Sequence, residues 1–145
     1  MVQGKTIFQL NLGDSIQKSH QITQQLVEAY GNVVGDKNPV HFDDGFAAGT
    51  VFKKRIAHGM LIAGFISEAI GMELPGPGCI YAKQDLNFVA PVYFGDTITV
   101  DIRVSDLLVE KNRVILDTIC TNQKGQVVVK GTAVVLPRKE KGDTQ

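Results

Sequence analysis

Residues 58–72 read HGMLIAGFISEAIGM, and apolar side chains stand at almost every position of this stretch. A helix that is apolar on nearly all of its faces is normally enclosed by other structure. The stretch therefore predicts a helix buried at the centre of the fold. Ala63 and Gly64 lack bulk, so we expect another element to approach the helix backbone there. The sequence PGPG at 75–78 ends the helix.

Four strand-like segments follow this helix. They are residues 79–89, 96–110, 113–122 and 126–137. Short turn sequences separate the later ones, at Gly95-Asp96, Lys111-Asn112 and Lys124-Gly125. Because these connections are short, we expect the strands to be antiparallel neighbours in a meander. One buried helix and a long antiparallel sheet predict an α+β domain in which a curved sheet wraps around the helix.

The part of the chain before the buried helix has mainly helical sequence patterns, in contrast to the strand-like segments that follow it. Residues 6–12, TIFQLNL, alternate apolar and polar side chains and predict a first strand that ends at Gly13-Asp14. Thr23 can cap a helix that runs to residue 34, and Gly35 suits the left-handed conformation that ends many helices. The expected apolar face of this helix is Leu26, Val27, Tyr30, Val33 and Val34. A short helical turn is expected over residues 43–49.

Size and composition restrict the possible functions. The 145 residues suit a single domain over 1–145, with a charged tail at about 138–145 that we expect to fray. Fifteen basic and fifteen acidic residues cancel, which argues against a nucleic-acid partner. The chain shows no signal-peptide pattern and no apolar run long enough to span a membrane, so a cytoplasmic protein is expected. Cys79 and Cys120 are expected to be reduced, small buried side chains.

The sequence GDKNPVH at 35–41 places two titratable groups, Asp36 and His41, five positions apart. They can cooperate only if the loop folds back, and Asn38-Pro39 favours such a turn. The two groups could then orient one water molecule and exchange its protons, as addition of water to a polarised double bond requires. The alternative is an ordinary surface turn in which Asp36 only binds loop amides.

His58 and Gly59 stand where the buried helix begins. The first N–H groups of a helix lack internal partners and lie at the positive end of its dipole. A carbonyl oxygen near the amides of Gly59 and Met60 would be polarised there, as in an oxyanion hole. The alternative is that His58 only caps or packs against the helix start. Ser67, a hydroxyl in an apolar helix, could equally bond the carbonyl four residues earlier.

A metal site is an alternative function for the histidines. His41, Asp43 and His58 are the residue types of a facial iron triad. Asp43 and His58 are separated by only fifteen positions, with the long strands all later in the chain, so this alternative is not favoured. We therefore expect no metal.

Two segments together carry a family resemblance. YGNVVGDKNPVHFDDGFAA followed by RIAHGMLIAGFISEAIG resembles the MaoC-like, R-specific enoyl-CoA hydratases, which have the hot-dog fold. The later segment GCIYAKQDLNFVAPVYFGDTITV resembles the family as well, so the resemblance covers nearly the whole chain. It implies that Asp36 and His41 are the catalytic pair, with Asn38 as a loop organiser. It also implies that Ser67 lies in the active site and that the N–H of Gly59 binds a thioester carbonyl.

The resemblance implies an enzyme of acyl thioesters. The expected reaction is reversible hydration of trans-2-enoyl-CoA to (R)-3-hydroxyacyl-CoA within fatty acid metabolism, without a cofactor, since coenzyme A belongs to the substrate. Alternatives are a hot-dog thioesterase, a dehydratase of carrier-protein, branched or dicarboxylic substrates, and a non-catalytic binding module. A homodimer is expected, because edge-to-edge pairing would remove an exposed sheet edge.

Substrate contacts beyond the reacting groups are less defined by sequence. Ile70 is the expected acyl-chain contact on the central helix, ahead of Leu61 and Ile62. His58 and Asn38 are also expected among the substrate-binding residues. The basic run 53–55, KKR, could meet coenzyme A phosphates or be an ordinary solvated cluster. Arg55 stands where relatives in this family often have proline, a difference expected to affect the entrance and not the chemistry.

Overall fold

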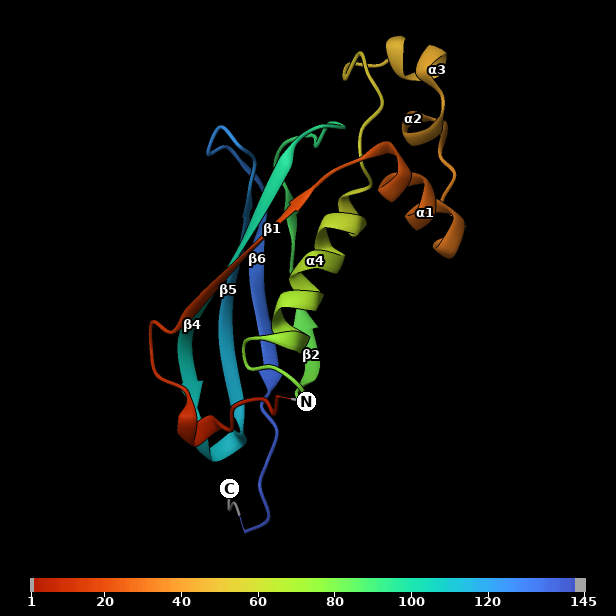
Figure 1. The fold of residues 1–145 in the computed structure, drawn as a ribbon. Coiled ribbons are helices and arrows are strands. Elements are labelled where there is room, and N and C mark those ends of the chain that lie inside the picture. The colour runs from red at the N-terminus through yellow and green to blue at the C-terminus, as the bar shows by residue number, and fades with distance from the viewer. Residues whose placement is uncertain (1, 143–145) are drawn as a thin grey trace.

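The computed structural model describes residues 2–142 and contains one antiparallel sheet of six strands curved around a helix (Figure 1). The strands are β1 (Ser15–Gln21), β2 (Ile80–Gln84), β3 (Asn87–Phe88), β4 (Thr97–Leu108), β5 (Arg113–Thr121) and β6 (Val127–Leu136). Their order is β1-β4-β5-β6-β2, and β3 also pairs with β6. The helix is α4 (Gly59–Met72), which lies along one face of the sheet. The expected α+β architecture, a curved antiparallel sheet around a long helix, is confirmed.

The core lies between α4 and the inner face of the sheet. From α4 it takes five side chains that recur on one side of the helix at each turn: Leu61, Ile62, Ile66, Ala69 and Ile70. The sheet supplies alternate residues of its long strands, such as Val100, Leu116 and Val135. Each large aliphatic side chain buried this way contributes about 1.5–3 kcal/mol relative to exposure. This packing holds the start of α4 in place.

One stripe of α4 remains exposed in the single chain. Met60, Gly64 and Ser67 fall on it, although the sequence predicted a helix enclosed on nearly all sides. The edge strand β2 is also largely exposed, from Ile80 to Lys83. In the single chain, the exposed stripe of α4 and the edge of β2 therefore leave apolar surface uncovered.

Two sequence predictions about strands were wrong. Residues 7–9 form a short 3₁₀ helix, η1 (Ile7–Gln9), in place of the strand expected over 6–12. Ile7 and Leu10 are buried, so the apolar residues of this segment anchor a short helical turn to the core instead of lining one face of a strand. The first strand, β1, follows at the sheet edge and was missed because its inward positions include Lys18 and His20, which give little apolar alternation.

The meander prediction holds only for the last three long strands. β4, β5 and β6 are antiparallel neighbours, joined after β4 by a short 3₁₀ helix, η2 (Val109–Lys111). The expected strand over 79–89 is instead broken into β2 and β3, and both pair with β6. The turn at Gly95-Asp96 therefore does not join neighbouring strands.

Three helices before α4 lie together outside the sheet, with α1 beside the start of α4 and α3 farthest from it (Figure 1). They are α1 (Gln24–Val34), α2 (Pro39–Phe42) and α3 (Asp44–Ala48). Thr23 caps α1 by accepting from the N–H of Leu26 at 3.1 Å, and Gly35 ends it with a φ of 84°. On the expected apolar face, Val27 is buried, whereas Val33 and Val34 are exposed. The short α2 and α3 carry the chain from there to the start of α4.

Other expectations can be compared with residues 2–142. Cys79 and Cys120 are free, and Cys120 is buried, with a pKa that burial raises to about 12. Within this range no helix has both the length and the hydropathy needed to cross a membrane. In the expected frayed tail, Arg138 donates a hydrogen bond to the carbonyl of Gly4, while residues 143–145 lie outside the described part.

Candidate active site

The loop between α1 and α2 folds back through short local hydrogen bonds. Asp36 accepts through Oδ1 from the N–H of Asn38 at 3.2 Å. Asn38 in turn caps α2 by accepting from the N–H of Val40 at 3.2 Å, and Pro39 occupies the first position of the helix. This places His41 one turn into α2, facing inward, with Asp36 exposed beside it. The loop thus brings together the two groups that the sequence singled out.

The hydrogen bonding of His41 fixes which nitrogen is free. Its Nδ1 lies 2.8 Å from the carbonyl oxygen of Ile56, which can only accept. Nδ1 therefore carries the proton in the neutral ring, and Nε2 keeps a lone pair. Burial lowers the pKa of His41 from its usual value of 6.5 and nearby His58 lowers it further, although the Ile56 carbonyl and Asp36 act in the opposite direction. At neutral pH, His41 is thus a neutral base.

His58 lies directly against His41. Its ring is stacked on the His41 ring, with centroids 3.8 Å apart and planes inclined by 30°. Its Nε2 lies 2.9 Å from the main-chain oxygen of Asp36, to which it must donate. The side chain is only 2% exposed and makes no capping hydrogen bond to α4, so of the two alternatives, capping the helix start or packing against it, the structure shows packing.

The start of α4 is open to a ligand on one side. Because no side chain caps the helix, its first N–H groups can stabilise an incoming negative charge. Gly59 faces the ring of Phe88, and a Cβ at Gly59 would come within 2.5 Å of that ring, so a larger residue would displace it. Both residues line an apolar hollow of about 430 Å³, together with Met60, Ile62 and residues 89–92.

Asp36, His41 and His58 each have one possible metal-ligand atom within 4.8 Å of the other two. The arrangement does not favour one shared ion. Lone pairs lie in the plane of an imidazole ring, and two stacked rings direct them side by side, whereas ligands of one metal must converge. The same closeness suits proton exchange between a base and a carboxylate.

Comparison with known proteins identifies the family. The family model described as MaoC like domain matches residues 11–128. The chain belongs to the MaoC-like family. In sequence, it is 45% identical over 124 residues to a protein of Rhodospirillum rubrum named (R)-specific enoyl-CoA hydratase, covering 86% of this chain and 85% of that protein.

Two further similarities involve other members of the MaoC-like group. A protein of Methylorubrum extorquens named 3-hydroxybutyryl-CoA dehydratase is 44% identical over 125 residues, which are 85% of this chain and 78% of that protein. Among solved structures, R-hydratase PhaJ1 from Pseudomonas aeruginosa in the unliganded form is 40% identical with a TM-score of 0.89. That match covers 99% of this chain and 96% of the other.

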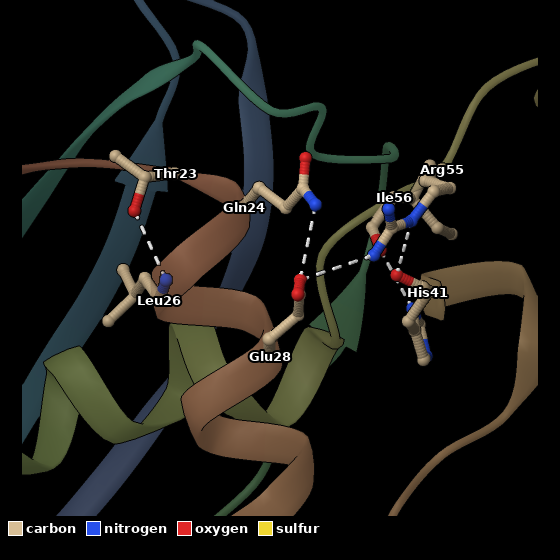
Figure 2. Close-up of polar contacts among 7 residues, drawn as sticks. All are labelled: Thr23, Gln24, Leu26, Glu28, His41, Arg55 and Ile56. Atoms are coloured by element: carbon tan, nitrogen blue, oxygen red, sulfur yellow. Dashed lines mark hydrogen bonds and ion pairs between the residues drawn. The ribbon is translucent and has the colours of Figure 1, made fainter. Parts of the chain in front are cut away.

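Arg55 has a different place in this MaoC-like chain from the one expected. It is 8% exposed, and its Nε donates to the main-chain oxygen of His41 at 2.8 Å (Figure 2). Its guanidinium also lies 4.0 Å from Glu28 of α1 and over the ring of Phe94. Arg55 therefore binds the segment that carries His41, and the prediction that it could meet coenzyme A phosphates is wrong for this residue because its side chain is buried.

The other two residues of the basic run remain at the surface. Lys54 lies with its Nζ 4.7 Å from the centre of the Tyr93 ring, and Lys53 is exposed. Both line a separate hollow of about 270 Å³ with Asp44 and Tyr93. Their contact with a coenzyme A phosphate stays a prediction.

Two expected substrate contacts lie away from Asp36 and His41 in the single MaoC-like chain. Ser67 is exposed on α4, eight residues after Gly59, which is about 12 Å along a helix. Ile70 is fully buried in the core and is not among the residues lining the 430 Å³ hollow, whereas Ile62 is. An acyl chain could meet Ile70 only by entering between α4 and the sheet, so its role stays a prediction.

Sequence reasoning missed Gly31, which permits α2 to pack on α1. A Cβ at Gly31 would overlap the ring of Phe42, the residue after His41. Glycine inside a helix costs about 0.5–1 kcal/mol relative to alanine, so a mid-helix glycine signals a packing reason. The sequence shows a glycine within the predicted helix, but it does not show that the ring of Phe42 packs against it.

Proposed function

We propose that this protein is an (R)-specific enoyl-CoA hydratase, which adds water reversibly to trans-2-enoyl-CoA and gives (R)-3-hydroxyacyl-CoA. The observation that carries the proposal is the neutral His41 ring, held by Ile56 so that its Nε2 lone pair remains free beside Asp36. Such a pair is what activation of water requires. Two relatives that match over most of their length carry hydratase and dehydratase names, which are the two directions of this reaction.

His41 acts as the base in the hydration direction. The water oxygen bonds to the β carbon of the substrate while a water proton passes to Nε2 of His41. The electron pair of the double bond moves toward the α carbon and the thioester oxygen. The protonated ring then returns a proton to the α carbon, the carbonyl re-forms, and His41 is neutral again. The Asp36 carboxylate holds the water by accepting its second hydrogen.

The thioester oxygen carries negative charge during this step. The uncapped start of α4, at Gly59 and Met60, offers N–H groups and the positive end of a helix dipole for that oxygen. Removing one donor of this kind typically costs about 100- to 1000-fold in kcat. The reaction needs no metal or redox cofactor, because its bond changes involve only water, protons and the acyl group, and coenzyme A is part of the substrate.

The proposal is tested with crotonyl-CoA. Loss of enoyl absorbance is followed for the wild type, Asp36→Asn and His41→Gln, and the configuration of the 3-hydroxybutyryl product is determined by chiral chromatography. Each variant should lose about 100- to 10000-fold in kcat/KM, in the range of general acid–base contributions. Asp106→Asn, at an exposed acid of β4, is the matched control and should keep full activity. Wild-type rates in both site variants, or an (S) product, would refute the assignment.

The runner-up activities have distinct products and substrates. A hot-dog thioesterase would release the coenzyme A thiol, which a thiol reagent detects in the same mixture. A dehydratase of carrier-protein substrates would turn over the crotonyl group faster on acyl carrier protein than on coenzyme A. Branched and dicarboxylic enoyl-CoA substrates belong in the same panel. Binding of these thioesters without turnover would indicate a binding module.

We further propose a homodimer formed through the β2 edge and the exposed stripe of α4. Ile80 and Tyr81 leave apolar surface uncovered on the edge, and Met60 leaves more on the stripe. A second copy would cover this surface and pair the free edge of β2. Light scattering during size-exclusion chromatography gives the mass in solution. Ile80→Lys should shift it toward the monomer, and a monomeric wild type would contradict the proposal.

A cytoplasmic location is likewise proposed. It is supported by the two free thiols, Cys79 and Cys120, which suit a reducing compartment. Fractionation of cells with an antibody to the chain would test it, and recovery from an oxidising compartment would contradict it.

A further inference from the structure

The imidazole of His58 is the most enclosed polar side chain near the catalytic pair. It is 2% exposed, and its Nδ1 has no hydrogen-bond partner within residues 2–142. Tyr30 and Phe42 enclose the ring from α1 and α2, with centroids 4.9 and 6.1 Å away. An unpaired buried nitrogen costs stability, so its presence needs a reason.

The His58 ring makes two close contacts, and both are with the catalytic pair Asp36 and His41. One face is stacked on His41, and the Nε2–H holds the main-chain oxygen of Asp36. These contacts join the two residues that carry the proposed chemistry, although they are five positions apart and Asp36 itself lies in an exposed loop. Because the ring is buried, it is poorly placed to contact the substrate, which differs from the substrate contact that the sequence predicted for His58.

We propose that His58 is a positioning residue that fixes the His41 ring and the Asp36 loop relative to each other, and this proposal rests on the proposed hydratase function. It acts through His41 and Asp36 and not on the substrate. Misplacement of a reacting group by about 1 Å can cost about 100-fold in rate, so a rigid link between the two is valuable.

The hydrogen bond of His58 also assigns its tautomer. Donation from Nε2 to the Asp36 carbonyl places the single proton of the neutral ring on Nε2. Its Nδ1 is buried without a partner among the described residues. Because the two rings are stacked, positive charge on one opposes positive charge on the other, which is the direction in which His58 lowers the pKa of His41. The other titratable or charged groups around the rings of His41 and His58 are Asp36, Tyr30, Glu28 and Arg55.

Two substitutions separate the two contacts. His58→Phe keeps an aromatic ring against His41 but cannot donate to Asp36, whereas His58→Gln keeps a donor close to the Nε2 position but loses the ring. We expect kcat to fall about 10- to 100-fold in both, with KM changed less than about threefold. The acid limb of the kcat/KM profile should move to higher pH in both. His20→Gln is the control, since His20 pairs with Glu68 on another face of α4 and should change neither quantity.

Imidazole NMR tests the inference independently of catalysis. The chain has only three histidines, so His41→Gln and His20→Gln assign all of the ring signals. The wild type should show His58 protonated at Nε2 and His41 at Nδ1, and the His41 titration should move upward in His58→Phe. His58 protonated at Nδ1, an unchanged His41 titration, or wild-type kcat in a folded His58→Phe protein would overturn the inference. If no enoyl thioester is a substrate, the proposed function fails while the NMR outcome still decides the role of His58.

Discussion

The guanidinium of Arg55 donates through Nε to the main-chain oxygen of His41 at 2.8 Å (Figure 2). The next residue, Ile56, accepts from the His41 ring at the same distance. His41 is therefore held at its backbone and at its side chain by two consecutive residues of the segment that leads into α4. Glu28, which accepts from Gln24 at 3.2 Å, lies 4.0 Å from Arg55 and extends these contacts to α1.

Loss of the Arg55 hydrogen bond should weaken both the fold and the active site. In Arg55→Met, the chain length is similar but the His41 carbonyl loses its donor. We expect the free energy of unfolding to fall by about 1–3 kcal/mol, as for a buried hydrogen bond to a charged group. We also expect kcat to fall several-fold, because α2 is less firmly held. Urea unfolding and crotonyl-CoA kinetics measure the two effects.

Glu28→Gln is the matched control for Arg55. The ion pair is long at 4.0 Å and Glu28 is partly exposed, so its removal should change stability by no more than about 1 kcal/mol. If Glu28→Gln were as harmful as Arg55→Met, the ion pair and not the hydrogen bond to His41 would be the important contact.

The pH dependence of kcat/KM should reflect His41. In the proposed mechanism its neutral form is the base, and its pKa lies below 6.5, with burial as the main cause. The neutral form therefore predominates at pH 7, and the acid limb of the activity should be centred below pH 6.5. Initial rates with crotonyl-CoA in buffers of constant ionic strength measure the profile. An acid limb centred above 6.5 would show that His41 is not buried as described or is not the base.

Much of the fold could be predicted from local patterns. The apolar run at 58–72, the Thr23 cap and the Gly35 end of α1 are local signals, and all three were confirmed. The strand expected at 6–12 was wrong because alternation over a few residues also fits a 3₁₀ turn that buries Ile7 and Leu10. β1 was missed because an edge strand is held by backbone pairing and needs few apolar side chains.

The candidate site was less accessible to sequence reasoning. Asp36 and His41 stood out because both are titratable and a turn sequence separates them. The roles of Arg55 and His58 depend on which atoms they reach across the fold, fourteen and twenty-two positions away in the chain. No spacing rule predicts that an arginine in a basic run turns inward to a main-chain carbonyl.

Gly31→Ala should impair activity through α2. A methyl group at this position overlaps the Phe42 ring, and a shift of Phe42 moves the adjacent His41. Overpacking of this kind costs about 1–3 kcal/mol, which outweighs the better helix propensity of alanine. Thermal unfolding and kcat should both fall. Gly49→Ala is the control, because its Cβ would meet only an ordinary contact with Phe46, and it should behave as the wild type.

The break between β2 and β3 depends on Gly131 of β6. Asp85, between β2 and β3, lies against β6 through two hydrogen bonds to Thr132. Its N–H donates to the Thr132 carbonyl, and its Oδ1 accepts from the Thr132 N–H, both at 3.1 Å. The carbonyl oxygen of Asp85 occupies the space that a Cβ at Gly131 would need. A continuous strand over 79–89, as the sequence predicted, would not bring the backbone this close.

Gly131→Ala should therefore destabilise the protein by about 1–3 kcal/mol or more, because backbone atoms must move to accept the methyl group. The displaced segment leads to Phe88, which faces Gly59, so KM for crotonyl-CoA should rise as the hollow changes shape. Calorimetry and steady-state kinetics measure these effects, and Thr132→Ala, which keeps the main-chain bonds to Asp85, is the neighbouring control. If Gly131→Ala unfolded at the wild-type temperature with an unchanged KM, the contact of Asp85 with β6 would not constrain β3, and the position of Phe88 would have to depend on other contacts.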